Sequence, residues 1–330
     1  MADTVAQNKN ITEDEAALYD RQIRLWGLEA QQRICTSSIL ICGMRGLSNE
    51  VCKNLVLAGV GAITIIDHNM ITEEDLGAQF FVTVEDIGKN KAMTSADRIR
   101  QLNPRVKVTS DSSNLSTKPD EFFKSFDLIC LTDSNSETMI RIDQICRKFD
   151  KKFYAASTYG FFGYIFCDLK QHEYIVERKI KLPHSEEHQI KVLKKMEDYI
   201  SFQDALSKSD CDYVVLWRFQ QEQGRLPIAT DIMDINKLKL IRNSFLQSNE
   251  IDNTNVSDEF IQTLAMNAPT EIAPVCAIIG GVLAQNILNV LSHKGLPIKN
   301  FFLYNGFQGN GYVYNVEQGK NIFNEKAIDN

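Results

Sequence analysis

The sequence SILICGMRGLSNEVCKNLVLAGVGAITIID, residues 38–67, contains one complete strand–helix–strand unit. Residues 39–42 are uninterrupted apolar residues and predict a buried strand, which Gly43 separates from a helix that ends near Gly59. Residues 62–66 predict a second buried strand. Short, fully apolar strands joined by a helix are typical of a parallel sheet that is covered on both faces.

The same alternation continues as far as residue 169. Further strands are expected at residues 106–109, 127–131 and 153–157, with helices at residues 89–102 and up to about residue 149 between them. Ligands bind such folds at the carboxyl ends of the strands. The pattern therefore predicts an α/β protein with a doubly wound, mostly parallel sheet of the Rossmann-like type.

The chain changes character after residue 170. Residues 171–270 are highly charged and largely helical by pattern, whereas residues 273–291 predict a strongly apolar helix with strands after it. We expect this last part to rejoin the first domain. The predicted domain therefore comprises residues 1–170 and 271–330, and residues 171–270 form a short, mainly helical insertion.

Composition excludes several classes of protein. The 330 residues carry a formal net charge of −7, which argues against a dedicated DNA- or RNA-binding protein. The N-terminus lacks the pattern of a signal peptide and no apolar run reaches about 18 residues, so we expect a soluble, intracellular protein. The eight cysteines include no C-x-x-C pair, so we expect reduced core thiols and no metal site.

The turn after the first strand lies where a nucleotide-binding fold has its phosphate loop. Gly43 and Gly46 would permit a tight turn before the helix, and Asp67, at the end of the second strand, occupies the place of a ribose-binding acid. However, Arg45 and Ser48 stand where such loops use glycine, and a side chain as long as arginine crowds a pyrophosphate. We expect a fold that has kept the turn and lost the ligand, which also argues against a nicotinamide dehydrogenase.

Several segments of the chain carry a family resemblance, which extends from about residue 12 to residue 317. It rests on YDRQIRLWG (19–27), the Gly43 turn, KNLVLAG (53–59), Asp67, DLGAQF (75–80), DIGKNK (86–91), APVCAIIGG (273–281) and NFFLYNGFQG (300–309). These segments resemble the ubiquitin-like-modifier activating enzymes, and most of all the smaller, non-thioester subunits of SUMO-activating heterodimers.

The resemblance implies an adenylation-type fold and an obligate heterodimer. The larger, thioester-forming subunit would bind ATP and Mg, adenylate the C-terminus of SUMO, and pass SUMO to the conjugating enzyme. This chain would bind no cofactor of its own and would be inactive alone. The resemblance further implies a location in the nucleus and also in the cytoplasm, with no membrane partner.

The family pattern also predicts that the nucleotide site of this chain is degenerate. Active relatives have a Ser-Asn-Leu-Asn-Arg-Gln run, and Ala78 stands here at the place of its arginine. An alanine cannot bind a phosphate oxygen. Lys91 and Asp133 remain at the places of the phosphate-binding lysine and the magnesium-binding aspartate, although both are also compatible with solvated loop charges.

The chain lacks the sequence context of a thioester-forming cysteine. None of its cysteines lies in the Pro-Cys-Thr setting of the family, and acids flank Cys211, which would raise the pKa of its thiol. We therefore expect no catalytic cysteine. On the resemblance, the 171–270 insertion is a remnant of the domain that carries this cysteine in relatives.

Arg21 is the candidate catalytic residue. Thr12 begins a capping box, so one helix is expected to run from Thr12 through Arg24. In the family, the arginine of the Tyr-x-Arg-Gln motif reaches the ATP bound by the other subunit, so the resemblance implies that Arg21 acts in trans. The alternatives are a surface salt bridge with Asp20 or Glu29, and Arg24 as the reaching arginine.

Three further alternatives stay open at the level of the sequence. The chain could be a stand-alone homodimeric adenylating enzyme in which Lys91 and Asp133 are active. It could also be the inactive half of an activating enzyme for another modifier, although the short insertion argues against this. The apolar helix at residues 275–291 could form part of a dimer surface or could pack in the core.

Overall fold

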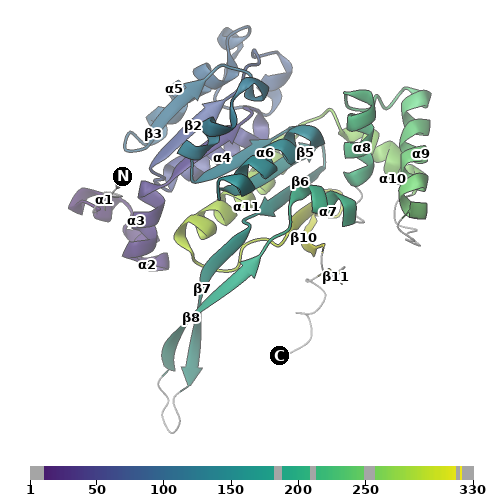
Figure 1. Ribbon diagram of the computed structural model, residues 1–330. Coiled ribbons are helices and arrows are strands. Elements are labelled where there is room, and N and C mark those ends of the chain that lie inside the picture. The colour runs from purple at the N-terminus through teal and green to yellow at the C-terminus, as the bar shows by residue number, and fades with distance from the viewer. Residues whose placement is uncertain (1–10, 182–187, 209–212, 249–256, 317–319, 322–330) are drawn as a thin grey trace.

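The computed structural model describes residues 11–181, 188–208, 213–248, 257–316 and 320–321. Within these ranges, nine strands form one sheet in the order β11-β10-β9-β6-β5-β4-β1-β2-β3 (Figure 1). The strands of its parallel half are β1 (Ser38–Cys42), β2 (Ala62–Ile66), β3 (Lys107–Asp111), β4 (Leu128–Thr132) and β5 (Lys152–Tyr159). The antiparallel half comprises β6 (Phe162–Asp168), β9 (Phe301–Asn305), β10 (Asn310–Asn315) and β11 (Lys320–Asn321).

The parallel half explains why the turn residues meet at one edge. Ile39 of β1 is paired with Ile63 of β2 on one side and with Leu128 of β4 on the other. The three strands therefore end level with one another, and the loops that follow them share the carboxyl edge of the sheet. The predicted doubly wound fold is confirmed, and an antiparallel extension places residues 301–315 in the same sheet.

Helices cover both faces of the sheet (Figure 1). One apolar cluster joins the sheet to α3 (Leu28–Thr36), α4 (Gly46–Leu57), α5 (Lys91–Leu102) and α11 (Ala273–Ser292). A second cluster, on the other face, includes α6 (Ser136–Lys148), α7 (Phe202–Lys208) and α8 (Tyr213–Gln223). Short 3-10 helices span Glu74–Gly77, Val84–Asp86, Leu115–Thr117 and Asp120–Ser125. A third cluster packs α9 (Ile232–Ser248) and α10 (Asp258–Asn267) against α8.

The apolar helix α11 belongs to the core. By length and composition it could cross a membrane, but 67% of its apolar window is buried. Its residues Val275, Ile279, Leu283, Ile287 and Leu291 face the cluster that contains α4. These side chains are therefore not a dimer surface, because the sheet and its helices already cover them.

The helical prediction for the insertion was wrong over its first part. The strands β7 (Gln171–Lys181) and β8 (His188–Asp198) pair antiparallel as a hairpin that projects from the body of the molecule (Figure 1). At the start of β7, side chains alternate between buried and at least partly exposed, with His172 and Tyr174 buried. The many charged residues of the hairpin hid this short period-two pattern, whereas residues 202–267 contain the expected helices.

A buried ionic cluster holds the root of the hairpin. Arg147 of α6 donates to both carboxylate oxygens of Asp168, at the end of β6, and to the carbonyl of Tyr199, just after β8. The backbone N–H of Phe202 donates to Asp143 Oδ2 over 2.7 Å. Burial and the neighbouring Asp168 raise the pKa of Asp143 to about 8, so this carboxyl stays protonated beside the ion pair.

The N-terminal arm, which we define as α1 (Glu13–Leu18) and α2 (Asp20–Trp26), departs from the prediction of one continuous helix. Thr12 forms the predicted capping box with Glu15. The helix then ends, because Tyr19 has φ −99° and ψ 17° and separates α1 from α2. The break turns the aromatic ring of Tyr19 into the protein, where its residue is 4% exposed.

Candidate functional site

The candidate site lies at the carboxyl edge of the parallel half, around the turn between β1 and α4. A cavity of about 930 Å³ opens there, next to a smaller one of about 210 Å³. The larger one is lined by Arg45, Asn69, Met70, Thr72, Glu74, Asp75, Lys91, Pro269, Thr270 and Glu271. The structure therefore brings the predicted residues of the glycine turn together with Lys91, and adds Glu271 from the segment before α11.

The chain itself occupies the hydrogen-bonding capacity of Asp67. Its Oδ2 accepts the N–H of Met44 over 2.8 Å, and its Oδ1 accepts both the backbone N–H and the side-chain amide of Asn69. Gly43 has φ +93°, and a Cβ there would lie 2.8 Å from Thr132 Oγ1. Asp67 therefore connects the turn to the loop after β2. Its carboxylate already accepts three hydrogen bonds from the chain, at the place where it would accept those of a ribose.

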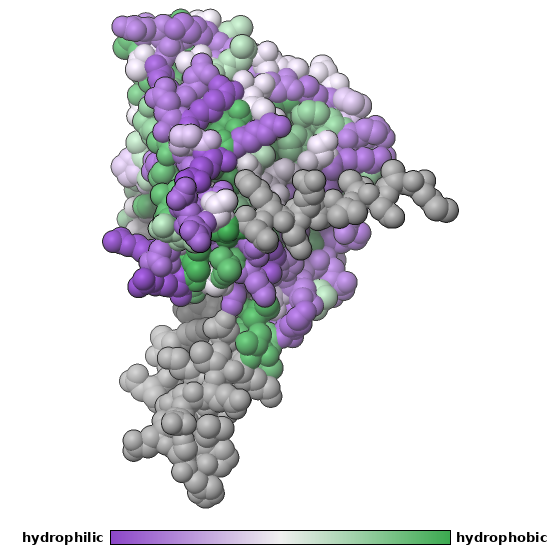
Figure 2. Space-filling model, turned by 90° about the vertical axis from the view of Figure 1, so that its left-hand side faces the viewer, coloured by the Kyte–Doolittle hydropathy of each residue, from purple (hydrophilic) through white to green (hydrophobic). Residues whose placement is uncertain are grey.

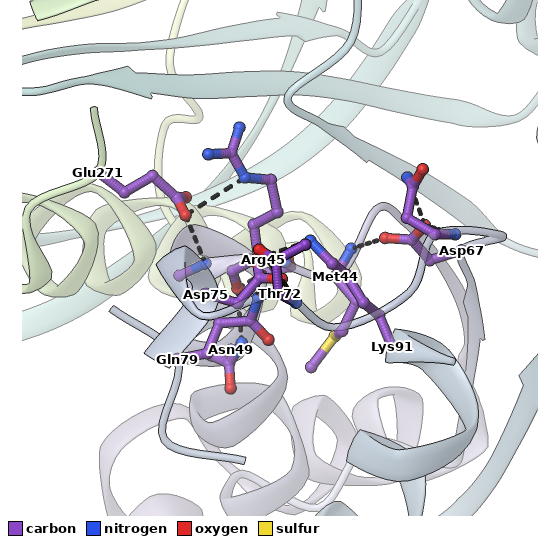
Figure 3. Close-up of polar contacts among 12 residues, drawn as sticks. Met44, Arg45, Asn49, Asp67, Thr72, Asp75, Gln79, Lys91 and Glu271 are labelled. Atoms are coloured by element: carbon purple, nitrogen blue, oxygen red, sulfur yellow. Dashed lines mark hydrogen bonds and ion pairs between the residues drawn. The ribbon is translucent and has the colours of Figure 1, made fainter. Parts of the chain in front are cut away.

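Gly46 opens α4, but the space in front of it is filled. A Cβ at Gly46 would lie 2.8 Å from the Cβ of Ala78 and 3.1 Å from Cys276 Sγ. The N–H of Gly46 donates to Glu271 Oε2 over 3.3 Å. A helix N-terminus favours an anion, and a carboxylate of the same chain supplies it here (Figure 3).

Arg45 and Glu271 form an ion pair across this turn. Arg45 Nε lies 3.3 Å from Glu271 Oε2, and the Glu271 side chain is 7% exposed. Burial and repulsion from Asp133 raise the pKa of Glu271 to about 7. Sequence reasoning missed Glu271, because it lies 225 residues from Gly46 along the chain and only the return of α11 brings it near.

Lys91 is not a solvated loop charge. Its Nζ lies 2.6 Å from Asp75 Oδ1, and the two side chains are 9% and 5% exposed. Thr72 and Gln79 donate to the same carboxylate. Burial opposes ionisation of Asp75, but the hydrogen bonds from Lys91 and Thr72 hold its pKa below the ordinary value. The phosphate-binding lysine of the family pattern is thus neutralised by its own chain.

Asp133 is not a solvated loop charge either. It follows β4 with φ +52°, and Ser157 Oγ donates to its Oδ1 over 2.7 Å. Its Oδ2 is buried without a hydrogen-bond partner among the described residues. Burial raises the pKa of this carboxyl, an effect that the nearby Arg45 opposes. The positive charge of Arg45 therefore acts on both Asp133 and Glu271.

These contacts do not fit a bound nucleotide. The positive groups that would hold phosphates, Lys91 and the first N–H of α4, already contact carboxylates, and Ala78 fills the space over Gly46. No group of His, Cys, Asp and Glu side chains suited to a metal ion occurs in the part of the chain that the structure describes. We therefore derive no chemistry through ATP or magnesium bound by this chain.

The pH dependence of stability tests the role of Glu271. Its folded-state pKa of about 7 lies above the ordinary glutamate value of about 4.3, so stability is lost as the pH rises between these values. Glu271→Gln, which stays neutral, should remove that loss and should be more stable than the parent at pH 8, by about 2 kcal/mol.

Urea unfolding of the purified chain at pH 5 and pH 8 measures this difference. The matched control is Glu74→Gln, which removes an exposed carboxylate from the lining of the same cavity. The control should keep the pH dependence of the parent. Identical pH dependence in the parent and Glu271→Gln would show that Glu271 is ionised throughout this range.

The described cysteines have the character of core thiols. Of the seven, six are buried and Cys35 is partly exposed. Burial raises the pKa of Cys52 and of Cys276 to about 12, which disfavours the nucleophilic thiolate. Cys211 lies outside the described residues. That no cysteine of the chain is catalytic stays a prediction.

Arg21 lies on the arm, apart from the residues around the β1–α4 turn. It is exposed, and it forms no hydrogen bond or ion pair with any residue that the structure describes. Asp20, which the sequence offered as a partner for Arg21, is bonded instead to Arg24, whose Nε lies 3.0 Å from Asp20 Oδ2. The surface salt bridge with Asp20 is therefore made by Arg24 and not by Arg21.

Exposed apolar residues accompany Arg21. Leu18, Leu25 and Leu28 are 58%, 77% and 50% exposed. Figure 2 views the molecule from the side of the arm, where apolar areas interrupt a largely hydrophilic surface. Large apolar side chains clustered on a protein surface are typical of an interface with another protein.

Comparison with known proteins gives a consistent result. The model of the ThiF family matches residues 19–321. SUMO-activating enzyme subunit 1 of Xenopus laevis is 39% identical over 335 residues, which cover 92% of this chain and 96% of that protein. The proteins of the same name from Homo sapiens and Danio rerio are each 38% identical, over 92% and 95% of this chain and 95% and 98% of theirs.

Proposed function

This chain belongs to the ThiF family, and on that premise we propose that it is the non-thioester subunit of a heterodimeric SUMO-activating enzyme. The partner subunit binds Mg-ATP and the modifier, adenylates the modifier and forms the thioester. This chain completes the adenylation site of the partner and supplies a large part of the dimer surface. The complex acts in the nucleus and also in the cytoplasm.

The single observation that carries this proposal is the contrast between the residues around the β1–α4 turn, whose charges are paired within the chain, and Arg21 on the N-terminal arm. At the place of the nucleotide site, charged groups are paired within the chain, Lys91 with Asp75 and Arg45 with Glu271. Arg21, by contrast, is exposed on an arm outside the sheet. An arginine that meets no described residue of its own chain is available to a ligand on another chain.

The chemistry of arginine suits this role. Its guanidinium is a planar, permanently charged group with five donors, and it binds phosphate oxygens in pairs. When adenylation separates pyrophosphate from the α-phosphate, negative charge increases on the phosphate oxygens. Arg21 would donate to these oxygens and stabilise that charge, as arginines supplied in trans do in other phosphoryl-transfer enzymes.

The arm also supplies a candidate part of the dimer surface. Leu25 and Leu28 are more than 40% exposed, and both lie within seven residues of Arg21. Burying such side chains against the partner would stabilise the complex and would bring Arg21 to the partner's site in the same step. SUMO and the conjugating enzyme would be contacted through this complex, without a role for DNA, RNA or a membrane.

Reconstitution tests the proposed function. The chain alone should show no modifier-dependent ATP–pyrophosphate exchange, and should restore exchange when it is mixed with the thioester-forming subunit. The partner alone is the control. Exchange by the purified chain without a partner would instead establish a homodimeric adenylating enzyme, and a complex that adenylates another modifier in place of SUMO would change the substrate assignment.

A further inference from the structure

The helix that carries Arg21 has no core of its own. Among Asp20–Trp26, the seven residues of α2, none is buried. An isolated helix of this length is unstable in water. The position of Arg21 must therefore be set by the residues at the two ends of α2, which are Tyr19 and Trp26.

Tyr19 attaches the first end of α2 to the body of the protein. Its ring lies against Gly59, where a Cβ would come within 2.4 Å of Tyr19 Cζ and Oη. Gly59 has φ +80°, a conformation that favours glycine. Asn103 Nδ2 donates both to Tyr19 Oη and to the carbonyl of Val56, each over 2.9 Å.

Trp26 attaches the second end of α2 through one intermediate side chain. Its Nε1 donates to Gln31 Oε1 over 3.0 Å. Gln31 is fully buried, and its Nε2 donates to the carbonyl of Ala58 over 3.1 Å. Both attachments therefore end on residues 56–59, at the carboxyl end of α4.

We propose that Tyr19 and Trp26 form a clamp on the end of α4, and that this clamp positions Arg21 for the partner's adenylation site. The proposal rests on the proposed function of Arg21. Tyr19 is buried against the body while Arg21, two residues later, is exposed, so fixing the Tyr19 side chain fixes the start of the helix that presents Arg21 to the outside. Fixing both ends of α2 limits the conformations that Arg21 samples before it meets the phosphates.

The test uses the heterodimer with its thioester-forming partner and measures ATP–pyrophosphate exchange at saturating ATP. Tyr19→Ala should slow exchange by roughly 10- to 100-fold, because a displacement of about 1 Å can have an effect of this size. The same substitution should have no further effect when Arg21 is already Ala. Tyr19→Phe keeps the ring against Gly59 and should retain most of the activity.

Two controls separate positioning from general loss of stability. Tyr199→Ala removes an equally buried tyrosine at the root of the hairpin. In a double variant with Arg21→Ala, the reduction in ATP–pyrophosphate exchange should equal the product of the two single reductions. Hydrogen exchange of the intact heterodimer should show faster exchange for amides 20–26 in Tyr19→Ala, with α4 unchanged. If Tyr19→Ala does not assemble, Tyr19→Leu replaces it, since leucine stays apolar but cannot reach Asn103.

The outcomes distinguish the two proposals. The clamp is supported if Tyr19→Ala has no further effect on ATP–pyrophosphate exchange in the Arg21→Ala background and if the amides of α2 show faster hydrogen exchange. Independent, multiplying effects of the two substitutions overturn it and leave Tyr19 with a structural role only. If Arg21→Ala alone leaves the exchange rate unchanged, the assignment of Arg21 is wrong and the clamp is overturned with it.

Discussion

Replacing Arg21 by Ala should slow adenylation of the modifier by about 10³-fold while the heterodimer still assembles. The size follows from other arginines supplied in trans, whose removal costs 10³-fold or more. Assembly should survive, because Arg21 bonds to no described residue of its own chain and no described contact depends on it. ATP–pyrophosphate exchange measures the rate, and size-exclusion chromatography of the complex measures assembly.

Arg24→Ala is the matched control for Arg21. It removes the same type of side chain from the same helix, but one that already pairs with Asp20. Exposed pairs of this kind contribute at most about 1 kcal/mol, so we expect an effect below tenfold. Lysine at position 21 should restore only part of the rate, since it keeps the charge and loses the planar pair of donors. A larger loss in Arg24→Ala than in Arg21→Ala would assign the role to Arg24.

Arg147→Ala should lower the free energy of unfolding by about 3 kcal/mol. The substitution leaves the carboxylate of Asp168, which is 1% exposed, without its cation, next to the buried Asp143. It also removes the hydrogen bond to the carbonyl of Tyr199. Because Asp168 and Tyr199 flank the hairpin, the loss should appear both in urea unfolding and as faster hydrogen exchange at the base of β7 and β8.

Arg141→Ala is the control for this substitution. Arg141 lies on the same helix and donates to a single backbone carbonyl, that of Lys118. We expect a loss of about 1 kcal/mol, the contribution of one ordinary hydrogen bond. Equal losses in the two variants would mean that the ionic cluster at the hairpin root does not contribute beyond one hydrogen bond.

Most of the parallel half could be predicted from the sequence because its strands are short, apolar and continuous. The observed β1, β2 and β4 agree with the expected strands to within one residue. The strand β6 was missed, since it follows β5 through a tight turn within one apolar stretch. At this turn the N–H of Phe161 donates to Asn267 Oδ1 over 3.1 Å, and Asn267 leaves no room for a Cβ at Gly160. No local pattern contains such a contact.

The sequence predicted which residues lie at the candidate site, but it did not predict which of them contact one another. The spacing of the glycines and the absence of the phosphate-binding arginine indicated a degenerate site. The contacts, however, join residues that are distant in the sequence. Lys91 pairs with Asp75, 16 residues away, and Glu271 accepts the first N–H of α4 from Gly46, 225 residues away. Likewise, the family pattern singled out Arg21, but the attachments of Tyr19 and Trp26 to residues 56–59, which hold α2, are visible only in the structure.

The helix α4 connects these two findings. Its first turn lies beside the internally paired charges of the candidate site and its last turn receives the arm, about 18 Å away for twelve residues. If the proposed function is correct, a mutation that distorts the first turn would move the arm and reduce turnover in the partner subunit. Selection for modifier activation would then act on residues around this turn even without a ligand bound there.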